Sequence, residues 1–414
     1  MEYNNRQSSG KRTMQIFSPM DRDHYFLADK ILKRLTRFIS KGSITFYYKD
    51  SAPIICNSGY AGPNAIIEIK SYRFLKRTLA GGYLGIAESY INGEWSSPSR
   101  STVFEFGAAN LEEFDRSITA NSVVKFMNFM IGLTNINTKR GSKRNIANHY
   151  DLGNDFFSEW LDESMTYSSG IHSNVNMTLE QAQVIKYQRI IEKLNIKSSD
   201  KVLEIGCGWG GFAEYAGKKT GAKITGITIS KEQLIYSSKR IKKSGLSDIV
   251  EIKLQDYRDV TGTFDKIVSI EMLEAVGESY WPKYFQTLST LLGSKGNAMV
   301  QVITIPDDYF NFYKSGTDFI QKYIFPGGML ICPNSISILS KVAGLNLTEA
   351  YYFGQSYAKT LEEWQERFQK AWHKLEKLDF DERFKRIWEY YLDYTSAGFK
   401  SGCTDVGQFH FTKS

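Results

Sequence analysis

The chain has 414 residues, which suits two or three domains, and 42% of its residues are apolar against 23% charged. This balance supports a large core and excludes an intrinsically disordered chain. The 52 basic and 45 acidic side chains give a formal net charge of +7, which fits anionic partners without selecting among phospholipid, nucleic acid and small anions.

The sequence does not indicate an exported protein, a membrane-spanning protein or a metalloprotein. Residues 1–15 contain no apolar stretch of the kind that a secretory signal needs. No apolar run reaches the roughly 18 residues of a transmembrane helix. The four cysteines are far apart and form no CxxC pair, so we expect neither a zinc site nor a disulfide framework. These features predict a cytoplasmic protein without a bound metal.

The first 50 residues are the most basic part of the chain, with ten basic and five acidic side chains. A helix is predicted over residues 27–39, because apolar residues recur there at helical spacing. Basic residues occupy its other faces, so the helix either lies on an anionic membrane surface or packs on its own domain. The apolar positions are Leu27, Ile31, Leu35 and Phe38.

The rest of the N-terminal part predicts a small mixed domain. Residues 43–70 carry the alternation and turn signals of short strands, and a mainly helical stretch follows to about residue 121. Residues 123–133 predict a buried helix or a surface-docking element, since they are too few to span a bilayer. The polar, basic residues 137–145 then predict a boundary between an α+β domain over 1–140 and a second domain over 141–414.

In the second domain strands alternate with helices. Apolar strands are predicted at 201–206, 222–229, 249–255, 264–273 and 297–305. A capping box formed by Thr178 and Gln181 opens a helix that runs to about Leu194. Such alternation predicts an α/β fold with a doubly wound, Rossmann-like parallel sheet covered on both faces. Residues 364–378 predict one further long helix, from apolar spacings of three and four.

A glycine-rich segment, GCGWGG at 206–211, follows the first of these strands and opens a helix. It satisfies the GxGxxG pattern, so a dinucleotide is one candidate ligand. However, the second strand ends in Thr228, Ile229 and Ser230 without the acid that would hold a ribose hydroxyl. An acid, Glu204, instead precedes the glycines. This arrangement favours S-adenosylmethionine (SAM) over a dinucleotide.

Several further segments appear in a particular order, and with them the chain resembles the cyclopropane-fatty-acyl-phospholipid synthase family. The resemblance extends from about residue 25 to the end. Residues 82–95 (GYLGIAESYINGEW) resemble the smaller lipid-associated domain of that family. The other segments are HYDLGNDFF (149–157), LDESMTYSSG (161–170), VLEIGCGWGG (202–211), GITISKEQ (226–233), LQDYR (254–258), SIEMLEAVG (269–277), TIP (304–306), YIFPGG (323–328) and SYAKTL (356–361).

The resemblance implies a Rossmann-like SAM-dependent methyltransferase domain with a smaller N-terminal α+β domain. It also implies a reaction in which SAM adds a methylene across the cis double bond of an unsaturated phospholipid acyl chain. A carbocation forms, so the pocket has to be apolar and dry. In the family, the base that removes a proton from the added methyl group is thought to be a bound bicarbonate.

The resemblance also implies roles for individual residues. Positions that contact SAM are Tyr167, Ser168, Glu204, Gly206, Gly208, Gly210, Thr228, Gln233, Asp256 and Tyr257. Positions at the bicarbonate ion are Glu274, Tyr357, Ser169, Gln301 and Ile303, the last through its backbone.

Two of the residues at the ion differ from the family pattern. Ser169 stands where the family has cysteine, and Gln301 stands where it has histidine. Serine and glutamine still donate hydrogen bonds, but glutamine carries no proton near neutral pH. We interpret these differences as those of a subfamily whose anion site is built differently.

Several alternatives stay open. Some relatives leave a methyl or methylene branch instead of a ring, and others methylate amines or other small molecules. A non-catalytic lipid-binding protein and a nicotinamide oxidoreductase are further rivals. The expected partners are unsaturated phospholipid acyl chains and, peripherally, an anionic membrane surface, with no nucleic acid. The sequence leaves the oligomeric state open, a homodimer included.

Overall fold

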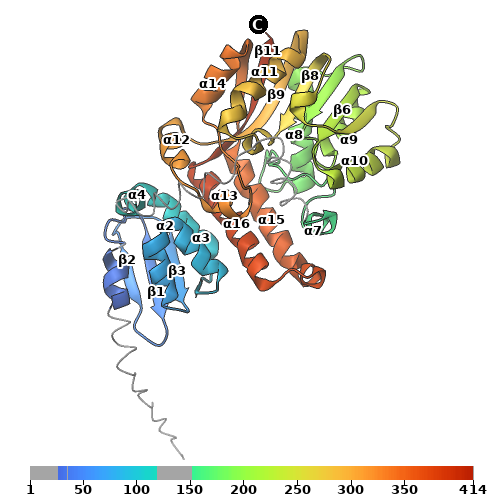
Figure 1. Ribbon diagram of the computed structural model, residues 1–414. Coiled ribbons are helices and arrows are strands. Elements are labelled where there is room, and N and C mark those ends of the chain that lie inside the picture. The colour runs from blue at the N-terminus through green and yellow to red at the C-terminus, as the bar shows by residue number, and fades with distance from the viewer. Residues whose placement is uncertain (1–26, 35, 119–151, 414) are drawn as a thin grey trace, which may run out of the picture.

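The computed structural model describes residues 27–34, 36–118 and 152–413, which form a small and a large β-sheet with their helices (Figure 1). The small sheet has the strand order β2-β1-β3-β4, in which only β1 and β3 pair in parallel. This confirms the strands predicted within 43–70. The strands are β1 (Ser43–Tyr48), β2 (Ile54–Asn57), β3 (Asn64–Ile69) and β4 (Trp95–Ser96).

Helices pack against the small sheet and confirm the predicted α+β character of this part. They are α2 (Arg73–Ile91), α3 (Arg100–Ala109) and α4 (Leu111–Ile118). The region predicted as a buried or docking helix (123–133) and the predicted domain boundary (137–145) lie outside the described residues.

The helix near the start of the described chain differs from its prediction. It covers residues 27–34, and its buried positions are Ala28 and Leu32, whereas Leu27 is 45% exposed and Phe38 is 60% exposed. The helix thus packs on its own domain through Ala28 and Leu32, whereas the apolar positions Leu27 and Phe38 remain exposed. Phe38 lies beyond the described helix.

The large sheet has seven strands in the order β10-β11-β9-β8-β5-β6-β7. The five strands from β9 to β7 are parallel, as predicted, whereas β11 runs antiparallel to both of its neighbours. The prediction missed β10 and β11. The strands are β5 (Lys201–Ile205), β6 (Lys223–Thr228), β7 (Val250–Leu254), β8 (Phe264–Ile270), β9 (Leu292–Thr304), β10 (Leu345–Tyr352) and β11 (Asp405–Lys413).

Two separate apolar cores cover the two faces of the large sheet, which gives the predicted doubly wound, Rossmann-like arrangement. Consecutive residues of β5 point to opposite cores: Val202 packs with α8, α9 and α10, and Leu203 packs with α11 and α14. Thr178 and Gln181 form the predicted capping box of α8. These helices are α8 (Leu179–Leu194), α9 (Gly211–Thr220), α10 (Lys231–Lys243), α11 (Trp281–Leu291) and α14 (Pro333–Val342).

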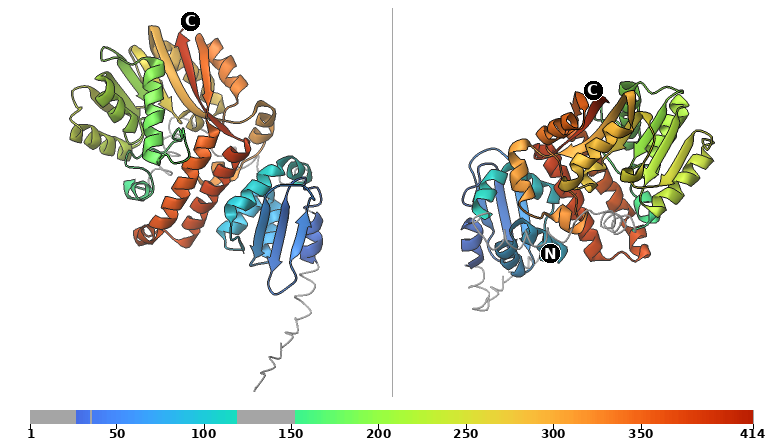
Figure 2. Two further views of the ribbon diagram at one scale, coloured as in Figure 1. Left: turned by 180° about the vertical axis from the view of Figure 1, so that it is seen from behind. Right: turned by 45° about the horizontal axis from the view of Figure 1, so that its top comes forward.

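Between β10 and β11 the chain forms a pair of long helices, α15 (Gly354–Leu375) and α16 (Glu382–Ser401), which reach from the large sheet to the small domain (Figure 2). The predicted long helix near 364–378 belongs to α15. Arg100 of α3 donates to Asp393 of α16 at 2.8 Å, and Tyr90 of α2 donates to Glu389 at 2.7 Å. The C-terminal helices therefore bind the two parts of the described chain together.

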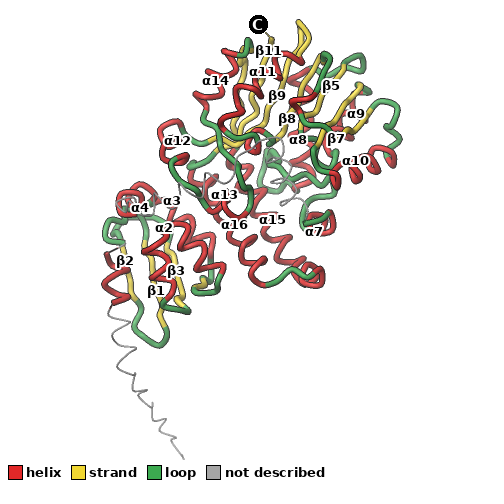
Figure 3. Tube along the Cα trace, viewed as in Figure 1, coloured by secondary structure: helices red, strands yellow, loops and turns green. Residues whose placement is uncertain are grey.

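Short helices and loops fill the space between the large sheet and the helix pair. Figure 3 shows these loops in green at the edge of the large sheet that faces α13 and α16. Because this edge holds the carboxyl ends of the parallel strands, it is where ligands bind in such folds. The short helices are α7 (Asn154–Ser158), α12 (Asp307–Lys314), α13 (Phe319–Tyr323) and the 3-10 turns at Tyr257–Asp259, Leu273–Ala275 and Glu278–Tyr280. A fourth 3-10 turn, Glu376–Leu378, directly follows α15 and leads into α16.

Candidate active site

The glycine turn (residues 206–211) connects the end of β5 to the start of α9. The backbone N–H groups of Gly206 and Cys207 both donate to the carbonyl of Ile227 on β6, at 3.0 and 2.9 Å. Gly206, Gly208 and Gly210 have φ values of 79°, 53° and 83°, which side chains other than glycine rarely tolerate. The turn therefore exposes backbone atoms closely to whatever occupies the space above it.

Residues distant in the sequence hold this turn in place. Trp209 donates from Nε1 to Asn154 at 2.7 Å, and Arg240 donates to the carbonyl of Trp209 at 3.1 Å. A Cβ atom on Gly211 would lie only 2.8 Å from the hydroxyl of Tyr187. The predicted segment 149–157 thus supports the turn through Asn154, and Gly211 allows the close approach of α8 and α9.

Polar residues at the ends of β6 and β7 lie on the same cavity as the turn. Thr228 donates to Gln233 at 2.8 Å. Both oxygens of Asp256 accept from Arg258, at 2.8 and 2.7 Å. The hydroxyl of Tyr257 is buried and has no hydrogen-bond partner among the described residues, and burial raises the pKa of Tyr257 to about 12. The structure therefore brings all four predicted residues to the cavity.

Glu204 and Lys186 are buried beneath this part of the cavity. Burial raises the pKa of Glu204 to about 8, against a hydrogen bond from the backbone of Ala213 and the charge of Lys186. Lys186 is fully buried on α8 and donates from Nζ to the hydroxyl of Ser168 at 2.7 Å. Burial lowers the pKa of Lys186 to about 7, against the charges of Glu271, Asp162 and Glu204.

Tyr167 and Ser168 lie between the glycine turn and the helix pair. The Tyr167 hydroxyl donates to the hydroxyl of Tyr391 on α16 at 3.0 Å, and its ring is 5.2 Å from that of Trp364 on α15. The carbonyl of Ser168 accepts from Gln183 of α8 at 2.9 Å. Both predicted residues therefore lie where elements from both ends of the large domain meet.

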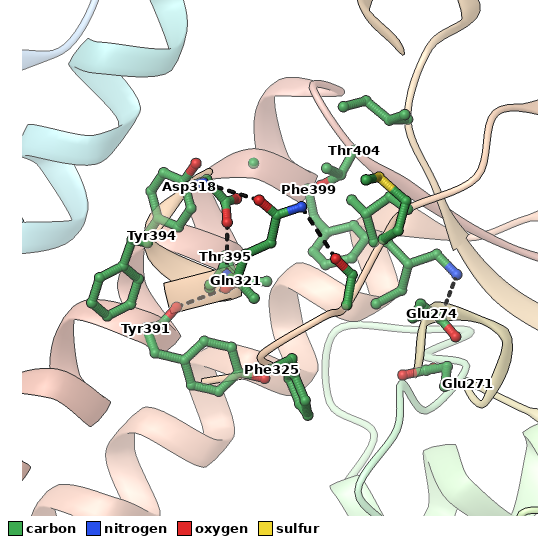
Figure 4. A pocket seen from close by; sticks show the side chains of 18 of the residues that line it. Glu271, Glu274, Asp318, Gln321, Phe325, Tyr391, Tyr394, Thr395, Phe399 and Thr404 are labelled. Atoms are coloured by element: carbon green, nitrogen blue, oxygen red, sulfur yellow. Dashed lines mark hydrogen bonds between the residues drawn. The ribbon is translucent and has the colours of Figure 1, made fainter. Parts of the chain in front are cut away.

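A cluster of buried carboxylates lies at the end of β8. Glu271 directly follows this strand, and Glu274 lies in the 3-10 turn Leu273–Ala275. Figure 4 shows the two side chains next to each other, with Phe325 and Tyr391 across the space. We call Glu271, Glu274 and the groups that donate to them the carboxylate cluster. The donors are Ser169, Gln301, Ile303 and Tyr357.

Three of these groups donate to Glu271. Its Oε1 atom accepts from the backbone N–H of Ser169 at 2.9 Å and from Nε2 of Gln301 at 2.8 Å. Its Oε2 atom accepts from the Tyr357 hydroxyl at 2.6 Å, and the Tyr357 ring is stacked on Phe399 with centroids 4.3 Å apart. The Ser169 hydroxyl, by contrast, donates to the carbonyl of Gly170. Ser169 therefore contributes its backbone to the cluster and not its side chain.

Glu274 has a different environment. Its Oε1 atom accepts from the backbone N–H of Ile303 at 2.6 Å, and its buried Oε2 atom has no partner among the described residues. Burial and the neighbouring charge of Glu271 raise the pKa of Glu274 to about 8. Glu274 therefore favours its protonated form near neutral pH, because a buried carboxyl group next to another carboxylate resists ionisation.

One cavity of about 670 Å³ joins the glycine turn to the carboxylate cluster. It continues along apolar and aromatic side chains of the helix pair and of the small domain. This is large enough for a cofactor and part of an acyl chain. Among the described residues, no group of three acidic, histidine or cysteine side chains could hold a metal ion. Representative apolar lining residues are Trp95, Phe104, Phe319, Phe325, Tyr391 and Phe399.

Sequence reasoning missed two residues of this site. Glu271 lies within the segment SIEMLEAVG that carried the resemblance, three residues before Glu274 and at the end of a strand, so a second carboxyl group could have been noticed. Lys186 stands at a buried position of α8, four residues from Ala182 and from Ile190. A lysine among the apolar positions of a predicted helix was the pattern that could have indicated a buried charge there.

The large sheet, with a glycine turn after its β5 strand and polar groups at the ends of β6 and β7, defines a Rossmann-like SAM-dependent methyltransferase fold. The solved structure of coclaurine N-methyltransferase shares this fold, with a TM-score of 0.59 at 17% identity.

Residues 137–409 match the mycolic acid cyclopropane synthetase family. The chain is 38% identical over 343 residues to the tuberculostearic acid methyltransferase UfaA1 of Mycobacterium tuberculosis, covering 79% of this chain and 78% of the relative. It is 33% identical over 376 residues to the cyclopropane-fatty-acyl-phospholipid synthase of Escherichia coli, covering 89% and 94%.

Among solved structures, the mycolic acid cyclopropane synthase CmaA1 in complex with SAH and CTAB matches with a TM-score of 0.62 and 28% identity, covering 66% of this chain and 98% of that one. The chain therefore belongs to the mycolic acid cyclopropane synthetase family, and it is a SAM-dependent methyltransferase that acts on lipids. Among the described residues, no helix is both long and apolar enough to cross a membrane.

Proposed function

We propose that this protein is a cyclopropane-fatty-acyl-phospholipid synthase, which uses SAM to add a methylene across the cis double bond of an unsaturated acyl chain. The observation that carries the proposal is the shared cavity, which has the glycine turn at one place and the carboxylate cluster at another. A methyl donor and an alkene would meet in this space, and holding them together is itself a source of rate enhancement.

The residues present fit SAM. The positive φ values of the glycine turn expose its backbone, and the buried, unpartnered hydroxyl of Tyr257 offers a hydrogen bond to a ligand. SAM supplies the electrophilic methyl group of the reaction. The residues proposed to hold it are Tyr167, Ser168, Glu204, Gly206, Gly208, Gly210, Thr228, Gln233, Asp256 and Tyr257. All of them except Gly210 line the cavity, and Gly210 instead faces Ser237 of α10.

The apolar part of the cavity fits an acyl chain. Phe325, Tyr391 and Phe399 bring aromatic surface close to the carboxylate cluster, and Trp95 and Phe104 extend this surface into the small domain. Aromatic faces stabilise a nearby positive charge, and an apolar wall keeps water away from the carbocation that the reaction forms. We propose that the residues beside the reacting carbons are Glu274, Tyr357, Ser169, Gln301 and Ile303, together with Glu271.

Peripheral contact with an anionic membrane surface forms part of the proposal, because the acyl chain resides in a bilayer. Leu27 and Phe38 are exposed, and the guanidinium of Arg37 lies over the Phe38 ring. Lys30 and Lys33 are exposed on the same segment. Exposed apolar and basic side chains in one segment suit the interface of an anionic bilayer. We propose a cytoplasmic location with such contact.

The test is to incubate the full chain with SAM and vesicles of a cis-monounsaturated phospholipid and to weigh the released acyl chains. We expect chains heavier by one CH2 unit and one SAH formed per chain. Vesicles of anionic phosphatidylglycerol should give a higher rate than vesicles of phosphatidylcholine, and the advantage should shrink as salt is added. Vesicles with only saturated chains are the control and should give no product. SAH formation only with an added amine would refute the proposal.

A second candidate product is a methyl or methylene branch. The 38% identity to a tuberculostearic acid methyltransferase favours this candidate. Ring and methylene products have the same mass, so proton NMR of the product separates them. Ring methylene protons at high field support the synthase, whereas vinylidene protons support the branch.

A further inference from the structure

Glu271 occupies an unusual backbone position. Its φ is 49°, which lies in the left-handed region that residues other than glycine adopt at a cost, and its N–H donates to the carbonyl of Gln301 at 2.8 Å. Backbone strain of this kind is concentrated at functional sites. This backbone conformation directs the Glu271 side chain from the end of β8 into the cavity, next to Glu274 (Figure 4).

The hydrogen bonds around Glu271 have a fixed direction. Arg189, which can only donate, donates to Oε1 of Gln408 at 2.7 Å. The Gln408 amide nitrogen donates to Oε1 of Gln301 at 3.0 Å, so the Gln301 amide nitrogen has to point toward Glu271. The Ser169 N–H can likewise only donate. Oε1 of Glu271 therefore accepts two hydrogen bonds and carries no proton.

These same groups are the ones that the family resemblance assigns to a bicarbonate ion. Ser169, Gln301 and Tyr357 already donate to Glu271, and the N–H of Ile303 already donates to Glu274. An added bicarbonate would have to compete with a covalently attached carboxylate for every donor. The residues present therefore do not fit a bound bicarbonate.

We propose that the Glu271 carboxylate takes the place of that ion and is itself the base of the reaction. This inference rests on the proposed function. The alkene π electrons form the new bond to the methyl carbon, and the S–CH3 electrons remain on sulfur as SAH forms. A cation is left on the chain. Glu271 then takes a proton from the new methyl group, and the released C–H electrons form the third bond of the ring. If a 1,2-hydride shift first moves the cation to the carbon that carries the methyl group, the same proton removal forms a methylene double bond instead.

The surrounding charges suit this role. Burial raises the pKa of Glu271, which makes its carboxylate a stronger base, while the charge of Lys186 and the three donors oppose this rise and favour the ionised form. Glu274 beside it is protonated near neutral pH, so only one of the two groups is a base. Catalytic sites commonly divide acid and base roles between two carboxyl groups in this way.

The first test compares wild type, Glu271→Gln and Glu278→Gln in bicarbonate-free buffer with and without added bicarbonate. Glu278 is the matched control, because it lies in the next 3-10 turn and pairs with Lys314 outside the cavity. We expect wild type and the Glu278 variant to be active without bicarbonate. Glu271→Gln should lower kcat by about 100-fold or more, as for loss of a general base, while SAM affinity measured by calorimetry stays within about twofold.

The second test removes the carboxylate and restores space for an ion. Glu271→Gly suits the positive φ, so it keeps the fold, and its lost activity should return when bicarbonate or formate is added. The inference is overturned if wild type needs bicarbonate, if Glu271→Gln keeps its kcat, or if neither ion rescues Glu271→Gly. It is also overturned if the product gains one CH2 unit plus one water, because Glu271 would then activate water. Absence of any lipid product from wild type would instead refute the proposed function.

Discussion

The glycine turn and the carboxylate cluster lie on one cavity but are built in opposite ways. The turn uses consecutive residues and presents neutral backbone atoms, positioned by the positive φ values of Gly206, Gly208 and Gly210. The cluster uses side chains and single N–H groups from separate segments, and it buries charge. Cofactor binding therefore depends on local backbone conformation, whereas the chemistry depends on distant residues that set the protonation of two carboxyl groups.

The largest expected effect comes from breaking the backbone conformation of the turn. A Cβ atom on Gly206 would lie 2.9 Å from Met272, and the φ of 79° is unfavourable for a β-branched residue. We expect Gly206→Val to weaken SAM binding by at least about 1000-fold, or about 4 kcal/mol, in isothermal titration calorimetry.

Gly245→Val is the matched control for this variant. Gly245 has a similar φ of 68°, but a Cβ atom there would meet no atom within 4 Å, and the residue is not on the cavity. Both variants should lose stability from backbone strain, and only Gly206→Val should lose SAM. Equal SAM affinity in the two variants would contradict the role of the turn.

A smaller effect is expected from removing the charge that links the two regions. Lys186 interacts electrostatically with Glu204 beneath the turn and with Glu271 in the cluster. Lys186→Met keeps the volume but leaves the buried Glu271 carboxylate without a nearby cation, and removing one partner of a buried ion pair costs about 3 kcal/mol or more. We expect this loss in the free energy of unfolding, measured with urea.

The control for this experiment is on the same helix. Lys193 is exposed and pairs with Glu349 at 2.8 Å, so Lys193→Met should change the stability by less than about 1 kcal/mol. Similar losses in the two variants would mean that Lys186 contributes no more than a surface ion pair does.

The same contrast explains which parts of the molecule could be predicted from the sequence. The glycine turn, the capping box of α8 and the five parallel strands depend on neighbouring residues, and the structure confirms them. Strands β10 and β11 were missed, although β11 is central to the site, since it places Gln408 opposite Gln301 in register. That pairing orients the Gln301 amide, and no local pattern encodes it.

The donors to Glu271 could likewise not be assigned from the sequence. The resemblance placed Ser169, Gln301 and Tyr357 around a common anion, and the structure does bring them together. All three donate to the carboxylate of Glu271, which we propose takes the place of that anion. Residue identity cannot show this, since it depends on the φ of Glu271 and on the neighbouring strand β9.

The smallest expected effect concerns the protonation of Glu204. Its pKa in the folded chain is about 8, above its ordinary value of 4.5. Between these values the folded chain holds a proton that the unfolded chain has lost. Stability from this group is therefore present at low pH and is lost as the pH rises, by up to about 1.4 kcal/mol per pH unit.

Glu204→Gln removes this titration and keeps a neutral side chain of the same size, so its stability should fall less steeply with pH than that of wild type. Glu274 titrates in both proteins, so its effect on stability cancels in the difference between them. The lowered pKa of Lys186 makes stability rise with pH, but mainly above about pH 7. We expect the stability difference between variant and wild type, measured by urea unfolding, to change by about 2 kcal/mol between about pH 5 and about pH 7. If the stability of the two proteins changed with pH in parallel, Glu204 would be ionised in the folded chain. The glycine turn would then lie over a buried negative charge, as the carboxylate cluster holds one at Glu271.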